Sequence, residues 1–157
     1  HTILRNGWYM ENLVASLPHV LATGTWYTSA GTGRVAHVAR ADAARAAAAA
    51  LTAATGTVTH TITGPTAYTT DEIAAIASEV FDRPISVVHV SDEQLAGGMA
   101  AAGMPPFVVD LVVSFDANTR AGRIDVTTDA VERLTGQAPQ TLAAFFAANR
   151  AAFLPEA

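Results

Sequence analysis

The residues best placed to do chemistry lie near the start of the chain, in the stretch TILRNGWYMEN of residues 2–12. Residues 2–6 are mostly apolar or β-branched and run into Asn6-Gly7, a favourable turn pair, so they predict a strand that ends in a turn. From Trp8 to residue 17, apolar side chains recur at helical spacing, which predicts a helix. Open α/β sheets bind their ligands where strands turn into helices, so this corner is a candidate site.

The side chains of this corner favour binding and orientation over acid–base catalysis. Gly7 permits the close approach of another group to the backbone. Trp8 and Tyr9 offer aromatic faces on which planar rings stack, although packing in the core explains Trp8 equally well. The hydroxyl of Tyr9 could donate a proton, but the sequence has no lysine to activate it. We therefore assign no catalytic residue.

The composition excludes several classes of site. The sequence has no cysteine, which rules out disulfides, thiolate nucleophiles and cysteine-ligated zinc. All nine basic residues are arginines, so the amine of a P-loop and a Schiff-base lysine are also excluded. The five histidines stand apart from one another without the spacing of a helical zinc motif. We expect no metal site.

Charge and hydropathy limit the classes of partner that the chain could bind. A net charge of −5 without a basic run argues against a nucleic-acid surface, which needs clustered Lys or Arg. No apolar run approaches the ~18 residues that a membrane span requires. These features predict a cytoplasmic protein whose partner is a small molecule.

Strands alternate with helices along the chain, a pattern typical of an α/β fold with a parallel sheet of βαβ units. The predicted strands are residues 2–6, 34–38, 57–63 and 85–90. The predicted helices are residues 8–17, 42–53 with Asp42 as N-cap, 70–81, a helix starting at 91–93, and segments within 105–121, 127–136 and 141–153. We expect 2–6 to lie parallel to 57–63, and 34–38 to pair with 85–90 in a smaller subdomain.

Four segments in this order resemble one family over nearly the whole chain. They are TILRNGWYMENL, SAGTGRVAHVARADAARAAAAAL, TITGPTAYTTDEIAAIASEVFDRPISVVHVSDE and AAGMPPFVVDLVVSFDANTRAG. Together they resemble the C-terminal half of an NmrA-like atypical short-chain dehydrogenase/reductase, closest to the NAD(P)H:quinone oxidoreductase type. The resemblance implies that residues 1–157 form one unit, the C-terminal part of a Rossmann-like fold with a small α/β substrate subdomain.

The family resemblance also implies roles for five residues. Asn6 and Gly7 match the turn beside the nicotinamide end of the cofactor, NAD or NADP, although relatives often have proline at the position of Asn6. Trp8 and Tyr9 would face a quinone-like substrate. Phe115 matches the helix near the substrate mouth, where core packing explains it equally well, and Asp116 and Arg120 on that helix most simply form an i, i+4 ion pair.

In this family the phosphate-binding fingerprint lies on an earlier strand. Gly31-Thr32-Gly33 resembles the start of such a fingerprint, but it precedes a predicted strand, whereas a phosphate-binding turn must open a helix. We therefore expect a plain loop there. The resemblance implies that another polypeptide segment supplies the phosphate side, and we expect the chain to associate with a missing N-terminal half or with a second copy of itself.

Two classes of function remain open from the sequence. The chain could be part of an oxidoreductase that passes hydride from NAD(P)H to a quinone or a similar flat acceptor, acting mainly through binding and orientation. Alternatively, it could belong to a non-catalytic regulator that senses NAD(P), or serve as an interaction module. The residues quoted above do not separate these alternatives.

Overall fold

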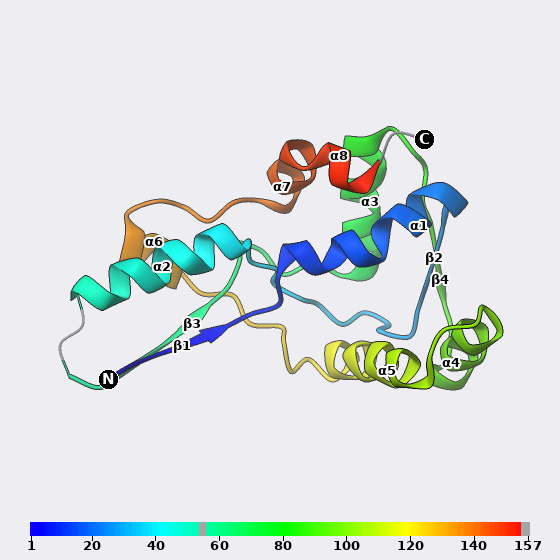
Figure 1. The fold of residues 1–157 in the computed structure, drawn as a ribbon, viewed down its shortest axis with the longest axis horizontal. Helices are drawn as coiled ribbons and strands as arrows, with labels where there is room; N and C mark the ends of the chain where they lie inside the picture. Colours follow the sequence, from blue (N-terminus) through cyan, green and yellow to red (C-terminus); the bar gives the residue numbers. More distant parts are fainter. Residues whose placement is uncertain (54–55, 155–157) are drawn as a thin grey trace.

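A computed structural model describes residues 1–53 and 56–154 as helices packed around two small sheets (Figure 1). The strands are β1 (Thr2–Asn6), β2 (Thr25–Thr28), β3 (Val58–Ile62) and β4 (Ser86–His89). The helices are α1 (Leu17–Thr23), α2 (Arg40–Ala53), α3 (Thr70–Phe81), α4 (Asp92–Ala101), α5 (Pro106–Arg120), α6 (Ala130–Thr135), α7 (Leu142–Ala148) and α8 (Arg150–Phe153), with a 3-10 helix at Met10–Ala15.

The first sheet confirms the predicted pairing of residues 2–6 with 57–63. Strands β1 and β3 run parallel, and their register places Thr2 opposite Val58 and Asn6 opposite Ile62. Both strands therefore end at the same edge of this sheet, where the turn at Gly7 begins.

The second sheet corrects the other predicted pairing. Strand β4 is paired in parallel with β2, and not with residues 34–38. Residues 34–38 are extended but make only single bridges, from Val35 to Tyr68 and from Val38 to Tyr9. The prediction missed β2 because it is only four residues long, although its start is marked by Gly24, which ends α1 in the left-handed conformation with a φ of 71°.

The predicted helix of residues 8–17 is also corrected. The chain forms a 3-10 helix over Met10–Ala15 and then begins a separate α-helix, α1, at Leu17. Pro18 lies in the first turn of α1, where its missing N–H is tolerated; inside a continuous helix it would remove a hydrogen bond. The apolar stripe Met10, Leu13 and Leu17 nevertheless faces the core, because all three side chains are buried.

Two hydrophobic clusters hold the molecule together. The larger one joins the 3-10 helix and α1 to α3, α7 and α8, and includes the rings of Phe81, Phe146 and Phe153, which meet at tilted or edge-to-face angles with centroids 5.2–5.5 Å apart. The smaller cluster packs α2 and α6 against β3 around Ile62 and Val131. Figure 1 shows α2 and α6 beside the first sheet, whereas α4 and α5 lie near the second sheet.

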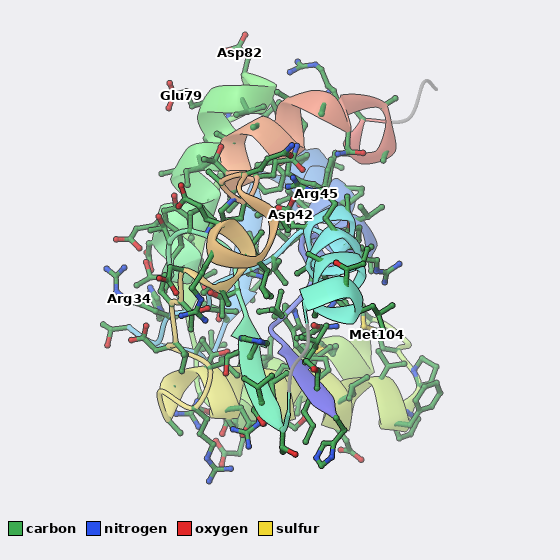
Figure 2. The ribbon with its side chains drawn as sticks, turned by 90° about the vertical axis from the view of Figure 1, so that its left-hand side faces the viewer. Arg34, Asp42, Arg45, Glu79, Asp82 and Met104 are labelled. Atoms are coloured by element: carbon green, nitrogen blue, oxygen red, sulfur yellow. The ribbon has the colours of Figure 1, made fainter. Side chains whose placement is uncertain are left out.

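Two helices begin with capping boxes, and the predicted cap at Asp42 is wrong. Thr69 and Glu72 form a capping box at the start of α3, and Ser91 and Gln94 form one at the start of α4. Asp42 is not an N-cap, because α2 begins at Arg40. Its buried carboxylate instead accepts a hydrogen bond from the backbone N–H of Gln140 at 2.7 Å and pairs with Arg45 (Figure 2).

The predicted C-terminal helices are present, but the last segment is divided. Residues 141–153 form α7 and α8, separated at Asn149, whose side-chain amide donates to the carbonyl oxygen of Phe145 at 2.8 Å. Within the described residues, none of these or the preceding helices has the length and apolar character needed to cross a membrane.

Candidate functional site

The candidate site is the corner that follows β1. The backbone N–H of Gly7 donates to the carbonyl oxygen of Ile62 at 2.8 Å, so the ladder between β1 and β3 continues into the turn. A Cβ atom at Gly7 would stand 3.1 Å from this oxygen and 3.4 Å from the carbonyl oxygen of Ala36. Three backbone segments thus converge on this glycine, and its own packing already explains the small residue.

The extended segment 34–38 holds the residues after the turn. Val38 donates its backbone N–H to the carbonyl oxygen of Trp8 at 2.8 Å, and Met10 donates to the carbonyl oxygen of Val38 at 3.0 Å. These two bonds hold residues 8 and 9 extended rather than helical. Consequently the neighbouring side chains of Trp8 and Tyr9 pack on different clusters, Trp8 on the larger and Tyr9 on the smaller.

Trp8 and Phe115 are brought together from opposite parts of the sequence. Their ring centroids are 4.2 Å apart at an interplanar angle of 71°, which is an edge-to-face contact. Both side chains are only partly buried, so some of this aromatic surface remains open. Of the predicted substrate residues, the structure therefore joins Trp8 with Phe115 and places the ring of Tyr9 elsewhere.

Tyr9 belongs to a polar group that includes Asn6. The side-chain amide of Asn6 donates to the hydroxyl oxygen of Tyr9 at 2.9 Å, which leaves the O–H of Tyr9 free to donate to another group. The guanidinium carbon of Arg40 lies 5.3 Å from the centroid of the Tyr9 ring. Glu11 in turn accepts from the backbone N–H of Arg40 at 3.0 and 3.1 Å. This use of Glu11 was not visible in the sequence, because the two residues are far apart along the chain.

His37 is a buried polar residue at the same edge. Its side chain is 4% exposed, and Nδ1 has no hydrogen-bond partner among the described residues. Burial lowers the pKa of His37 to about 4, so the imidazole is neutral at physiological pH. The carbonyl oxygen of His37 packs so closely on Gly64, just after β3, that a Cβ atom there would overlap it. In the sequence His37 is one of five isolated histidines, and no local pattern marks its burial.

The loop Gly31-Thr32-Gly33 is closed by helix α5. Gly33 donates its backbone N–H to the carbonyl oxygen of Ala30 at 3.1 Å, and the chain then continues into the extended segment 34–38. A Cβ atom at Gly33 would overlap the carbonyl oxygen of Thr119. The loop therefore leads into extended chain rather than a helix, as the sequence predicted. Within the ranges 1–53 and 56–154, no cluster of His, Asp and Glu is suited to hold a metal ion.

The polar end of α5 corrects a predicted ion pair. Arg120 pairs with Asp92 at the start of α4, at 2.8 Å, rather than with Asp116 one turn earlier on its own helix. Asp116 instead accepts from the hydroxyl of Thr28 at 2.9 Å and from the backbone N–H of Ser29 at 2.7 Å. Both acids thus connect α5 to the end of the second sheet, a contact that the spacing within one helix could not reveal.

The chain is similar to curated reductases over most of its length. The chain is 31% identical over 145 residues to Quinone oxidoreductase 2 of Escherichia coli, and 30% identical over 153 residues to an NAD(P)H azoreductase of Xenophilus azovorans. These matches cover 91% and 97% of the chain. They cover 50% and 54% of the relatives, so the chain spans about half the length of the curated relatives it matches.

Solved structures agree with these sequence matches. The NADPH complex of the E. coli quinone oxidoreductase superposes with a TM-score of 0.83 at 31% identity, over 90% of the chain and 50% of that structure. No family model matches the sequence. The parallel strand pairs and these structural neighbours show that the chain has a Rossmann-like α/β fold and is similar to NAD(P)H-dependent reductases.

Proposed function

We propose that this chain is part of an NAD(P)H-dependent oxidoreductase that reduces a quinone or a similarly flat acceptor. In this proposal, residues 1–157 form one unit, the C-terminal part of an NmrA-like reductase domain, and contribute the substrate side of the cleft. Similarity to a quinone oxidoreductase and an azoreductase supports a reductase over a regulator that senses NAD(P) without turnover.

The observation that carries the proposal is the Trp8–Phe115 pair beside the turn that ends β1. Two partly buried aromatic rings with centroids 4.2 Å apart can bind a planar apolar ring by stacking or edge contact. The pair lies just after Asn6-Gly7, at the carboxyl edge of a parallel sheet, where such sheets bind ligands.

The described residues fit the nicotinamide end of the cofactor better than its phosphates. Asn6 and Gly7 would lie beside the nicotinamide, and the exposed Asn6 side chain stands next to the free O–H of Tyr9. For the diphosphate, the only glycine-rich loop of this type, Gly31-Thr32-Gly33, leads into extended chain and opens no helix. When bound, the cofactor supplies the hydride; another polypeptide segment would hold its phosphates.

The residues of this chain then act by orientation. Trp8 and Phe115 hold the acceptor ring and exclude water from one of its faces. Tyr9 packs apart from this pair, on the smaller cluster, and its O–H, fixed by the amide of Asn6, is left to bind a polar group at the nicotinamide side of the corner. The guanidinium of Arg40 over the Tyr9 ring adds positive potential at this part of the corner.

A binding experiment on the chain tests the acceptor site without requiring turnover. The titration uses a 1,4-naphthoquinone and follows the indole N–H signals of Trp8 and Trp26 by NMR. We expect the quinone to shift Trp8 selectively, and Phe115→Leu to weaken binding about fivefold, the size expected for one aromatic contact.

Phe107→Leu is the matched control, because Phe107 lies on the same helix but is 72% exposed and makes no aromatic contact with Trp8. Equal effects of the two substitutions, or a quinone that leaves the Trp8 signal unchanged, would refute the proposed acceptor site.

A further inference from the structure

The second sheet has a pocket at its own carboxyl edge, distinct from the corner after β1. Eight residues line it, from the loop after β2, the end of β4, the start of α4 and the end of α5: Ser29, Gly31, His89, Val90, Ser91, Asp92, Glu93 and Arg120. Its volume is about 400 Å³, within the range of small-molecule sites. The location obeys the general rule that ligands bind beyond the carboxyl ends of parallel strands.

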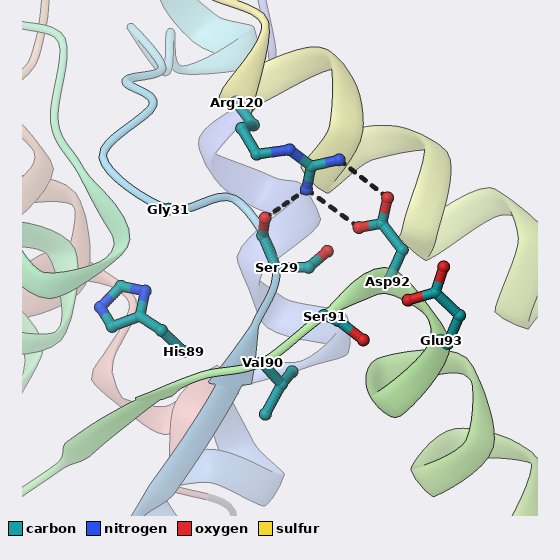
Figure 3. A pocket seen from close by; sticks show the side chains of 8 residues that line it. All are labelled: Ser29, Gly31, His89, Val90, Ser91, Asp92, Glu93 and Arg120. Atoms are coloured by element: carbon teal, nitrogen blue, oxygen red, sulfur yellow. Dashed lines mark hydrogen bonds and ion pairs between the residues drawn. The ribbon is translucent and has the colours of Figure 1, made fainter.

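Hydrogen bonds fix the shape of this pocket before any ligand arrives. Arg120 donates to both carboxylate oxygens of Asp92, at 2.9 and 2.8 Å, and also to the carbonyl oxygen of Ser29. These bonds tie α5, α4 and the loop after β2 together at one point (Figure 3). In the same view, the carboxylate of Glu93 lies beside Asp92, whereas the side chain of Ser91 points away from Arg120.

The pocket offers both donors and acceptors to a ligand. Arg120 has five N–H donors and makes three hydrogen bonds in the contacts described above, so some of its N–H groups can still donate to a ligand. A hydrogen bond from the Ser91 side chain lowers the pKa of Glu93, which keeps that carboxylate ionised and able to accept. Hydrogen bonds from Arg120 lower the pKa of Asp92 to about 2, so this group too is an acceptor only.

This combination discriminates among ligand classes. A quinone carbonyl only accepts hydrogen bonds and could not satisfy the carboxylates of Asp92 and Glu93. An ammonium group only donates and would meet the guanidinium of Arg120, while a phosphate would be repelled by the two carboxylates. A hydroxyl group both donates and accepts, and two adjacent hydroxyls can bind a carboxylate and a guanidinium together.

We propose that the pocket formed by Ser29, Ser91, Asp92, Glu93 and Arg120 binds a small polyhydroxylated molecule through vicinal hydroxyl groups. The carboxylates of Asp92 and Glu93 accept from the hydroxyls, and Arg120 donates to them. Val90 and the backbone around Gly31 cover the carbon skeleton. This proposal depends neither on the proposed quinone site nor on the proposed reductase activity.

The test is an NMR titration of the whole chain with ribose locked as methyl β-D-ribofuranoside, whose one vicinal pair of hydroxyls is at C2 and C3, compared with its 2-deoxy analogue, which lacks that pair. We expect ribose to shift the backbone amides of residues 29–31, 89–93 and 120, and the deoxy sugar to bind at least about fivefold more weakly, the loss expected for one hydrogen bond. Shifts confined to the corner at residues 6–9, equal binding of the two sugars, or no shift with ribose would overturn the proposal.

A pair of isosteric variants locates the interaction. Glu93→Gln removes the charge of an exposed side chain that does not cap α4, and is expected to weaken ribose binding about tenfold. Glu79→Gln changes an exposed glutamate on α3 in the same way, outside the pocket lining, and is expected to leave binding unchanged (Figure 2). Unchanged binding in the Glu93→Gln protein, with its amide spectrum otherwise intact, would contradict the assigned role of Glu93.

Discussion

At the scale of single residues, the corner after β1 is arranged by contacts between residues far apart in the sequence. The amide of Asn6 is occupied by the hydroxyl of Tyr9, and the ring of Trp8 rests on Phe115. Asn6 therefore already binds a neighbouring side chain, and any contact with a cofactor would use its other hydrogen-bonding groups. The buried imidazole of His37 adds a titratable group to the same edge.

His37 predicts how stability depends on pH. Because burial lowers its pKa to about 4, the unfolded chain binds a proton on this residue between pH 4 and the ordinary histidine pKa of ~6.5, whereas the folded chain does not. The stabilisation is therefore complete above pH ~6.5 and is lost as the pH falls toward 4, by about 3 kcal/mol in total.

Urea unfolding at several pH values between 4 and 7 measures this dependence. We expect His37→Leu to flatten the dependence of the unfolding free energy on pH in that interval, because a leucine at this position binds no proton. His19→Leu, which replaces an exposed histidine, should keep the slope. A slope that is identical in the wild type and the His37→Leu protein would show that other groups cause the acid sensitivity.

At the scale of elements, close backbone crossings and helix starts determine where each segment lies. Gly64 lets the chain after β3 pass directly over the carbonyl oxygen of His37, and Gly33 does the same for the loop that meets Thr119 on α5. The capping box of Thr69 and Glu72 starts α3, and Arg34 extends it by pairing with Glu72 at 2.8 Å. These contacts hold the segment of residues 33–38 between the two sheets.

The same substitution at two glycines should have opposite effects. Gly64→Ala places a Cβ atom against the carbonyl oxygen of His37 and is expected to lower the free energy of unfolding by about 3 kcal/mol or more. Gly97 lies within α4, has no neighbour within 4 Å of a built Cβ and has no positive φ. Gly97→Ala is therefore expected to raise the unfolding free energy by about 0.5–1 kcal/mol. Denaturant unfolding of both variants checks the two signs; a tolerated Gly64→Ala would refute the close crossing.

At the scale of the whole molecule, the chain carries two parallel strand pairs, each with its own set of carboxyl-end loops. Helix α5 links them, since Phe115 touches Trp8 at one corner and Arg120 closes the pocket at the other. Within the described residues, each sheet has only two strands, so each strand has one edge with no strand beside it. The chain spans about half the length of the curated relatives it matches, and in the proposed function another segment supplies the phosphate side.

The chain by itself should bind NAD(P)H weakly, with a dissociation constant on the order of a millimolar or weaker. The reason is that its sequence has no glycine-rich turn opening a helix, the motif that binds the diphosphate. Isothermal titration calorimetry with NADH and NADPH at millimolar concentration measures this affinity. A micromolar dissociation constant would show that the loop of residues 31–33 binds phosphate in a way that its geometry does not suggest.

The open edge of β1 should promote association between copies of the purified chain. Ile3 on this strand is 45% exposed, and the unpaired backbone groups beside it can pair with another strand. We expect sedimentation velocity to detect dimers or larger species at high concentration, and Ile3→Lys to reduce them by placing a charge on the edge. Leu51→Lys, at an 85% exposed position on α2, is the control. A stable monomer at all concentrations would refute association through this edge.

The sequence by itself determined the α/β class, the parallel pairing of β1 with β3, and most helices, because apolar periodicity and capping residues act over short distances. It also placed the candidate site at Asn6, Gly7, Trp8, Tyr9 and Phe115, partly through family resemblance. Only the tertiary structure decided that β4 pairs with the short strand β2, that Trp8 and Tyr9 pack on different clusters, and that Arg120 binds Asp92 instead of Asp116. Each of these depends on contacts between residues distant in the chain, which local patterns do not encode.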